Sequence, residues 1–466
     1  MCGGCTARKI PHDGIQGMRM SGLELQTCTA GSWHGEQPGM INGLATDTRK
    51  LNQGDAFVAL RGPNYNGHDF AAEAANRGAA ALIGDADGMD SWQGIALPKL
   101  EVQDSLRALG DIAGHWRSTL SVPVVAITGS YGKTTLRAML EHVLALKGLR
   151  VTATRSNDNN LVGVPQTLLR IRPDDDVALI ECGISESGEM PRLAAMVRPD
   201  VAVITGIAEA HAEGLGGIAE VAEEKALLFD ALAAGGCAVL GSGVSALLAD
   251  RLWDKKAKVL DVDAGDVSTV AWQMSACNVT LSCGTESHSF DLPLPATHWA
   301  QDAALAATIL AHMQLASLTE VAQAMSTWEP VGGRMRSIAG LHGCTLLDDS
   351  YNANPASMAA ALDTLRHVSG RRIAVLGDMA ELGVDSGRLH AGLDVSGLDA
   401  VLLVGDEMNA LSALRDEVHH MADVEQVVAA LRGMGLGSGD TLLVKGSRCM
   451  HMERVVDALR GGGDAV

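Results

Sequence analysis

The most regular hydrophobic pattern in the chain lies at residues 122–147. A short, mainly β-branched apolar run at 122–128 leads into a turn that contains glycine. After the turn, apolar residues recur at helical spacing: Leu136, Met139, Leu140, Val143 and Leu144. A short continuous run favours a buried strand and the later spacing favours an amphipathic helix, so this segment predicts strand, turn and helix in succession.

Similar patterns divide the rest of the chain. Between residues 20 and 118 they predict short strands at 54–60 and 79–83, with helices at 68–77 and 103–118. From 122 to about 330, strands and helices alternate, which is typical of a parallel sheet covered on both faces. The strands expected there are 122–128, 177–181, 201–205 and 236–240. The helices expected there are 133–147, 190–197, 218–234 and 300–314.

Two later regions differ from this alternation. Residues 256–293 carry alternating polar and apolar runs, which favour antiparallel strands. From about residue 334 a new α/β unit begins. Its expected strands are 345–347, 372–376, 401–404 and 441–444.

Composition narrows the class of partner. The chain has 466 residues and a net charge of −20, from 36 basic and 56 acidic residues. A polyanion needs a basic surface, so this charge argues against nucleic acid. No apolar run reaches the roughly 18–20 residues of a membrane span, and no secretion signal is apparent, so we expect a cytoplasmic protein. The nine cysteines are expected to be reduced, and the isolated pair Cys2 and Cys5 favours a disordered tail over a zinc site.

The turn after the first strand has the features of a phosphate-binding loop, with the sequence TGSYGKTT at 128–135. Gly129 and Gly132 allow close approach of an anion, and the amides of the following helix N-terminus point at it. Lys133 would reach the outer phosphates, and the hydroxyl of Thr134 would bind Mg²⁺. The loop is shorter than the strict pattern, which has glycine at the position of Ile127. It predicts an ATP-type nucleotide site.

Polar residues at other strand ends extend this site. Open α/β sheets bind their ligands at the carboxyl ends of the strands, where Glu181 and the loop bearing His211 follow two predicted strands. Both are candidate Mg²⁺ ligands beside Thr134. Lys225, in the helix after His211, is by itself best interpreted as a solvated lysine paired with a nearby carboxylate.

Four further segments carry polar or charged residues that could contact ligands. The asparagine-rich stretch 157–160 is either an ordinary turn or a lining of the active cleft. The segment 348–355 could bind a ribose, a metal or a substrate, and also fits a helix N-cap followed by proline. Arg334 lies at a domain joint from which a guanidinium could reach phosphates, while Lys445 and Arg448 suit a carboxylate.

Taken together, these motifs resemble the Mur ligases, ATP-dependent amide-bond formers of peptidoglycan synthesis, over residues 40–457. The segments that carry the resemblance are NDNNLVGVPQTLL at 157–169, ECGISESGEM at 181–190, AH at 210–211, DDSYNANPASM at 348–358, LGDMAELG at 376–383, VKGSR at 444–448 and TDTRKLNQGDAFVALRGPNYNGHDF at 46–70. Those at 348–383 are most similar to the family's dipeptide-adding member.

The resemblance implies a fold and a reaction. The fold is α/β with three domains: a central P-loop ATPase domain with a parallel sheet, an N-terminal α/β substrate domain and a C-terminal Rossmann-like domain. The expected ranges are a tail at 1–20 and domains at 21–120, 121–332 and 333–466. The substrates would be ATP, UDP-N-acetylmuramoyl-tripeptide and D-alanyl-D-alanine, joined through an acyl phosphate by an enzyme that we expect to be a monomer.

The resemblance also assigns roles to residues. Two Mg²⁺ ions would be held by Thr134, Glu181, His211 and a carbamylated Lys225, with Lys133 also catalytic. The nucleotide would contact Gly129, Ser130, Gly132, Lys133, Thr134, Thr135, Asp302, Arg334 and Asp349. The other substrates would contact Thr48, Arg49, His68, Asp69, Asn159, Asn160, Tyr351, Asn352, Asn354, Lys445 and Arg448.

Two residues depart from the family pattern. Asp302 stands where the family has an asparagine near the adenine, and Tyr131 stands where it has a small polar residue. Two other functions fit parts of the pattern: a sister ligase that adds a single amino acid, and a non-catalytic regulatory protein that binds nucleotide. The motifs at 348–383 argue against the first, and retention of the five residues Lys133, Thr134, Glu181, His211 and Lys225 argues against the second.

Overall fold

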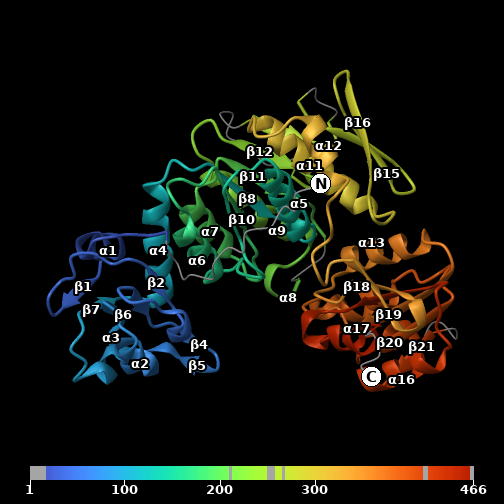
Figure 1. Cartoon of the computed structure of the whole chain (residues 1–466). Helices are drawn as coiled ribbons and strands as arrows, with labels where there is room; N and C mark the ends of the chain where they lie inside the picture. The colour runs from blue at the N-terminus through green and yellow to red at the C-terminus, as the bar shows by residue number, and fades with distance from the viewer. Residues whose placement is uncertain (1–16, 209–211, 249–257, 265–267, 413–417, 462–466) are drawn as a thin grey trace, which may run out of the picture. The chain divides into compact units, whose positions relative to one another are not determined.

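The computed structural model describes residues 17–208, 212–248, 258–264, 268–412 and 418–461 (Figure 1). The chain forms two compact units. The first comprises Met1–Val124, Thr152–Ile180 and Ala195–Arg198, and the second comprises Val125–Val151, Glu181–Ala194 and Pro199–Val466. Among the described residues, no helix combines the length and the apolar character needed to cross a membrane.

The N-terminal part is built on a five-stranded sheet in the order β1-β7-β6-β3-β2. Its strands are β1 (Ser32–His34), β2 (Leu44–Ala45), β3 (Ala56–Val58), β6 (Ala81–Asp85) and β7 (Lys99–Val102). Strand β1 is antiparallel to β7, and the other pairs are parallel. The α-helices are α1 (Gly22–Thr29), α2 (Ala71–Asn76), α3 (Ala86–Met89) and α4 (Ser105–Ser118). The expected strands and helices are confirmed, whereas α1, β1 and β7 were not predicted because they are short and carry many polar residues.

The expected tail overlaps with this folded part. Residues 1–16 lie outside the described residues, but Met18 and Met20 are buried and Met20 pairs with Ile41. Met18 and Met20 therefore belong to the folded part and not to a tail.

The central sheet has six strands in the order β13-β12-β11-β8-β10-β9. They are β8 (Val124–Thr128), β9 (Val151–Ala153), β10 (Val177–Glu181), β11 (Val201–Ile204), β12 (Cys237–Leu240) and β13 (Lys258–Asp261). The pairs β8–β11, β11–β12 and β12–β13 are parallel. Every residue of β8, β10, β11 and β12 is buried, as a sheet covered on both faces requires. The α-helices described in this region are α5 (Lys133–Leu146), α6 (Gly163–Arg170), α7 (Glu189–Val197), α8 (Ala212–Leu215), α9 (Ile218–Ala226), α10 (Val244–Leu247), α11 (Thr297–His312) and α12 (Leu318–Met325).

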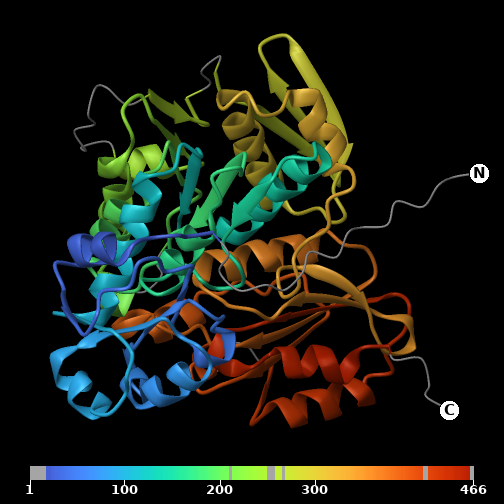
Figure 2. The same ribbon diagram turned by 60° about the vertical axis from the view of Figure 1, so that its left-hand side comes forward.

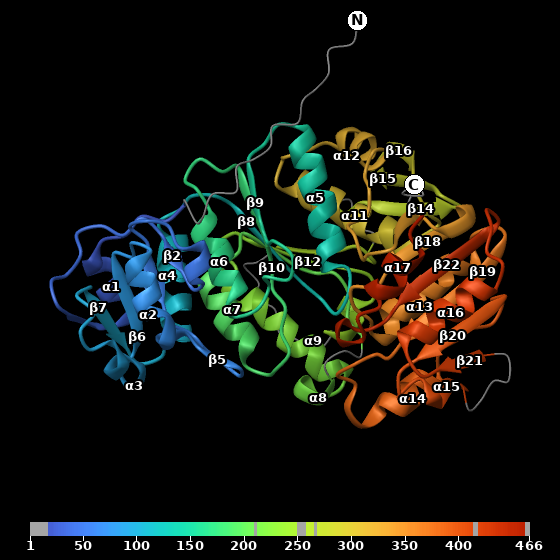
Figure 3. The ribbon, with the colours of Figure 1, turned by 60° about the horizontal axis from the view of Figure 1, so that its bottom comes forward.

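The region 256–293 is antiparallel only in its later part. Strands β14 (Ala271–Ser275), β15 (Asn278–Cys283) and β16 (Glu286–Asp291) form an antiparallel sheet, as predicted. Strand β13 instead pairs in parallel with β12, so the antiparallel prediction is wrong there. In Figures 2 and 3 the antiparallel sheet lies beside α11 and α12, and these two helices pack against α5.

The C-terminal domain is a six-stranded sheet in the order β17-β18-β22-β19-β20-β21. The strands are β17 (Arg336–Ala339), β18 (Thr345–Asp349), β19 (Arg371–Gly377), β20 (Ala400–Val404), β21 (Val418–Met421) and β22 (Asp440–Lys445). Only the edge strand β17 is antiparallel to its neighbour. Alternate strand residues pack against α16 (Val424–Gly433) and α17 (Glu453–Leu459), while α13 (Pro355–Arg366) contacts β19 and β22 (Figure 1).

Candidate nucleotide-binding active site

The phosphate loop joins β8 to α5 and depends on two glycines. Gly129 has φ +144° and Gly132 has φ +82°, in a region that other residues rarely adopt. A Cβ atom on Gly129 would lie 2.1 Å from Oγ1 of Thr205. Only glycine therefore fits at this position.

Hydrogen bonds fasten the loop to the segment after β11. The amide of Ser130 donates to the carbonyl of Gly206 (2.8 Å), and its hydroxyl bonds both the carbonyl and the amide of Ala208 (3.1 Å each). Thr205 donates its hydroxyl to the carbonyl of Tyr131. The contacts with residues 205–208 thus hold the loop in shape, and the first amides of α5 have no partner within the helix and could bind an anion.

Lys133 is the first residue of α5, and its side chain lies against the phosphate loop. Its Nζ donates to the carbonyl of Gly129 at 2.5 Å. Burial is the main reason that the pKa of Lys133 is lowered to about 8; the charge of Glu181 acts to raise it, and the positive charge of Arg334 acts to lower it. A phosphate in the loop would replace the carbonyl as partner and favour the charged form.

Thr134 and Glu181 come together as predicted. Oγ1 of Thr134 lies 3.1 Å from Oε2 of Glu181, which is fully buried at the end of β10. The other carboxylate oxygen accepts a hydrogen bond from Nε of Arg137 at 2.7 Å, and Arg137 also pairs with Glu141. Glu181 is therefore held by a buried guanidinium while one oxygen faces the threonine hydroxyl.

Lys225 is not a solvated lysine. It is only 1% exposed, so the interpretation from the helix pattern alone is wrong. Burial lowers its pKa to about 7, and the charge of Lys133 acts in the same direction, opposed by Glu224 and Cys182. The helix α9 turns this side chain inward because Val221, Ala222 and Ala226 share its buried face.

His211 lies outside the described residues. Among those that the structure describes, no three His, Cys, Asp or Glu side chains gather closely enough to hold a metal ion. The other three predicted metal ligands are Thr134, Glu181 and Lys225. They supply a hydroxyl, a carboxylate and an amine, so only Glu181 is acidic.

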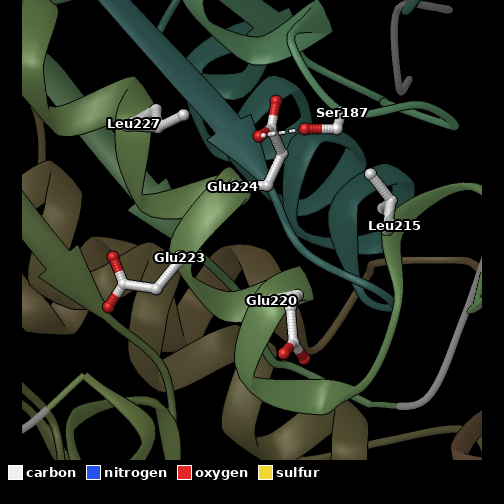
Figure 4. A pocket seen from close by; sticks show the side chains of 6 residues that line it. All are labelled: Ser187, Leu215, Glu220, Glu223, Glu224 and Leu227. Atoms are coloured by element: carbon white, nitrogen blue, oxygen red, sulfur yellow. Dashed lines mark hydrogen bonds between the residues drawn. The ribbon is translucent and has the colours of Figure 1, made fainter.

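An acidic pocket of about 280 Å³ lies beside α9 (Figure 4). Its lining residues are Ser187, Leu215, Glu220, Glu223, Glu224 and Leu227. The Glu224 carboxylate accepts a hydrogen bond from the amide of Gly188 at 2.8 Å and lies 3.4 Å from the Ser187 hydroxyl. None of the predicted site residues lines this pocket.

Asp302 lies under the phosphate loop. It is buried on α11, and its Oδ1 would be 3.0 Å from a Cβ atom on Gly132. Its Oδ2 has no hydrogen-bond partner, and burial raises the pKa of this carboxyl well above its usual value. The same burial, with the charge of Asp302 close by, raises the pKa of Tyr131.

Arg334 joins the C-terminal domain to the phosphate loop. Its guanidinium carbon lies 4.3 Å from the ring centre of Tyr351, and its Nη2 lies 3.4 Å from Oγ1 of Thr134. The guanidinium of Arg448 lies 5.9 Å from the same ring. Asn354 caps α13 and donates from Nδ2 to the carbonyl of Ser130 at 3.0 Å.

Asp349 and Lys445 pair with each other. They are partners in the register of β18 and β22, and Nζ of Lys445 lies 2.7 Å from Oδ2 of Asp349. Lys445 also donates to the carbonyl of Asn352 (2.9 Å), and Oδ1 of Asp349 accepts from the amide of Met335 (3.1 Å). Arg448, by contrast, has a 59% exposed side chain that pairs with Glu453 at 3.2 Å. Of the two cations at this strand end, Arg448 is the accessible one.

The predicted N-terminal residues differ in exposure. Thr48 is buried, and Arg49 is exposed and pairs with Asp47 at 2.8 Å. His68 is 1% exposed, and its Nδ1 donates to Oδ1 of Asn66 at 2.9 Å. Its Nε2 has no hydrogen-bond partner. Asp69, next to it, is exposed.

In the asparagine-rich loop, Oδ1 of Asn160 accepts from the amides of Val162 (3.1 Å) and Gly163 (2.9 Å), at the start of α6. The turn interpretation of this loop is therefore confirmed for Asn160. Asn159 is half-buried, and Asn160 is exposed.

Sequence reasoning missed Arg137 and Thr205. Arg137 lies one helical turn after Lys133, so its spacing from the phosphate loop was available as a signal. Thr205 directly follows β11, whose end was expected to face the site. Its contact with the phosphate loop arises because β11 pairs with β8, and this pairing cannot be seen in the sequence.

Comparison with known proteins assigns the family. Three family models match: the Mur ligase family catalytic domain at 40–117, the Mur ligase middle domain at 127–310 and the Mur ligase glutamate ligase domain at 333–448. The UDP-N-acetylmuramoyl-tripeptide–D-alanyl-D-alanine ligase of Escherichia coli strain K12 is 36% identical, over 91% of this chain and 94% of its own.

Two further matches agree. The ligase of the same name from a Synechocystis strain is 35% identical, over 93% of this chain and 95% of its own. A crystal structure of MurF from Acinetobacter baumannii is 27% identical, covers 95% of this chain and 99% of its own, and has a TM-score of 0.85. The predicted three-domain α/β fold is thereby confirmed, and the chain belongs to the Mur ligase family.

Proposed function

We propose that the protein is a MurF ligase, which joins D-alanyl-D-alanine to UDP-N-acetylmuramoyl-tripeptide at the expense of ATP. The observation that carries this proposal is the 36% identity, over nearly the full length of both chains, to a ligase named for that reaction. In the reaction, the tripeptide carboxylate attacks the γ-phosphorus of ATP, the bond to the β–γ bridging oxygen breaks, and ADP leaves. The dipeptide amine then attacks the acyl phosphate, loses a proton and displaces phosphate.

The phosphate loop suits the first step. The proposed triphosphate site comprises Gly129, Ser130, Gly132, Lys133, Thr134 and Thr135. The glycine conformations and the amides of α5 support it, because both favour a bound anion. Lys133 and Arg334 would stabilise the charge that develops on the transferred phosphoryl group.

The residues around Thr134 suit a magnesium ion, because a hydroxyl and a buried carboxylate oxygen lie 3.1 Å apart there. We place the two Mg²⁺ ions with Thr134, Glu181, His211 and Lys225, the last as its carbamate. Bound Mg²⁺ neutralises negative charge on phosphates and carboxylate. Arg137 holds the Glu181 carboxylate in place, and the lowered pKa of Lys225, about 7, provides the neutral amine that carbamylation needs.

Exposure separates the proposed roles of the two cations at the end of β22. Arg448 is proposed to bind the dipeptide carboxylate because it is exposed, whereas Lys445 is proposed to position the β18–β22 strand ends through Asp349. Tyr351, Asn352 and Asn354 are the neighbouring contacts. Asp349 is proposed at the ribose and Asp302 at the adenine.

Other assignments concern the N-terminal domain and the chain as a whole. Thr48, Arg49, His68 and Asp69 are proposed for the uridine nucleotide, and Asn159 and Asn160 for the peptide. The domain ranges are proposed as 21–120, 121–332 and 333–466. The enzyme is proposed to act in the cytoplasm as a monomer.

Product analysis tests the function. The purified protein, incubated with ATP, Mg²⁺, UDP-N-acetylmuramoyl-tripeptide and D-alanyl-D-alanine, should yield a product whose mass corresponds to the nucleotide-linked pentapeptide. A product formed only with a single amino acid would assign the chain to a sister ligase. Nucleotide binding without any product would favour a non-catalytic binding protein.

A further inference from the structure

His390 is a buried histidine that none of the assignments above uses. It lies on the short helix α14 (Ser386–Ala391) and is fully inaccessible to solvent. Its Nε2 lies 2.9 Å from the amide of Met379, and its Nδ1 lies 2.8 Å from the carbonyl of Ser386. A backbone amide can only donate and a carbonyl can only accept, so the ring is neutral with its proton on Nδ1.

The amide that donates to His390 belongs to Met379, in the loop after β19. Next to Met379, the Asp378 carboxylate accepts from the amide of Met408 at 2.9 Å. Gly405 has φ +113°, and a Cβ atom there would lie 2.3 Å from Cγ of Asp378. The loop is therefore packed against the residue after β20, and the hydrogen bond from Met379 to His390 holds it to α14.

The same loop holds the turn that carries Arg448. The amide of Ala380 donates to Oγ of Ser447 at 2.7 Å, and the amide of Ser447 donates to the carbonyl of Asp378 at 2.9 Å. Oγ of Ser447 in turn donates to the carbonyl of Ala353 at 3.3 Å. Hydrogen bonds thus run without a break from His390, through residues 378–380, to the residue before Arg448.

We propose that His390 is a positioning residue for the dipeptide site: it fixes the loop 378–380, which fixes Ser447 and so the placement of Arg448. The inference rests on the proposed function, because Arg448 is the group assigned to the dipeptide carboxylate. His390 itself contacts no substrate. Removing its acceptor would leave the Met379 amide buried without a partner and free the loop to shift.

Replacing His390 with glutamine or with asparagine distinguishes the roles of its two ring nitrogens. In His390→Gln the side-chain oxygen reaches the place of Nε2 and can accept from Met379. In His390→Asn the shorter side chain reaches only the place of Nδ1, so the bond to Ser386 is kept and the bond to Met379 is lost. His367→Gln serves as the control, because the His367 side chain is 62% exposed on the protein surface.

Steady-state kinetics and hydrogen exchange then test the role. Loss of the acceptor should raise the KM for D-alanyl-D-alanine about tenfold in His390→Asn, the cost of one unpaired buried donor. The KM for ATP and kcat should stay within about twofold, and His390→Gln should stay within about threefold of the wild type in every constant. The amides of residues 379–380 should exchange faster in His390→Asn only.

Three other results would contradict this proposal or the function on which it rests. Equal exchange in His390→Asn and the wild type, or an unchanged dipeptide KM, would refute the positioning role. A parallel loss in all constants in both variants would show that His390 acts on the fold alone. A wild-type protein that does not use D-alanyl-D-alanine would instead refute the proposed function, and with it the substrate assigned to this loop.

Discussion

The proposed carbamylation of Lys225 requires a neutral amine, and the lowered pKa of this buried side chain lets the neutral fraction be calculated. With a pKa of about 7, about half of the Lys225 side chains are neutral at pH 7. A lysine with the ordinary pKa of 10.5 would be neutral in only about one molecule in three thousand. Burial therefore raises the concentration of reactive amine about a thousandfold. The neutral amine adds to carbon dioxide, forming an N–C bond and releasing one proton.

A carbon-13 NMR spectrum of the protein in ¹³C-labelled bicarbonate measures this directly. We expect one carbamate resonance that persists at pH 8 and weakens severalfold at pH 6, where the amine takes up a proton. The resonance should vanish in Lys225→Arg, because a guanidinium stays charged. It should persist in Lys258→Arg, which changes an exposed lysine of the same domain. A resonance that survives Lys225→Arg would show that another residue carries the carbamate, and no resonance at pH 8 would show that Lys225 is not carbamylated.

Three further predictions concern the residues around the phosphate loop. Arg137→Met should raise the Mg²⁺ concentration needed for half-maximal turnover about tenfold or more, since the buried Glu181 loses its ion-pair partner, and Arg137→Lys should recover part of the loss. Gly129→Ala should lower the affinity for ADP, measured by calorimetry, by about a hundredfold, because its Cβ atom would lie 2.1 Å from Thr205. Asp302→Asn should remove a decline in thermal stability with rising pH: the raised pKa means that the folded state holds a proton above pH 3.8 that the unfolded state has lost.

Each of these has a contrary result. An Arg137→Met enzyme with a normal Mg²⁺ requirement would mean that Glu181 needs no support. Unchanged ADP binding by Gly129→Ala would show that the loop can relax. If the melting temperatures of the wild type and Asp302→Asn differ by the same amount at pH 5 and pH 8, Asp302 does not titrate in that range.

The order of strands and helices was largely predictable from local pattern. The long apolar runs of β8, β10 and β11 are buried over their whole length, so composition alone identifies them. Strand β13 was assigned the wrong direction because a four-residue strand carries no mark of the strand with which it pairs. The phosphate loop was predictable because glycine, lysine and threonine must stand close together in sequence.

The candidate site was predictable only where neighbours in sequence are neighbours in space. Lys225 stands in a run of charged residues that resembles a solvated helix face, and only packing shows that it points inward. Asp349 and Lys445 are almost a hundred positions apart, and they pair because β18 and β22 bring them into register. His390 gave no signal of its own, since its role depends on the loop after β19.

The ligase activity is best tested by measuring phosphate release with each component omitted in turn. We expect release only when ATP, Mg²⁺, UDP-N-acetylmuramoyl-tripeptide and D-alanyl-D-alanine are all present. Lys133→Ala should abolish this release without unfolding the protein. Release that continues without the dipeptide or the nucleotide-linked peptide, or a normal rate in Lys133→Ala, would contradict this expectation.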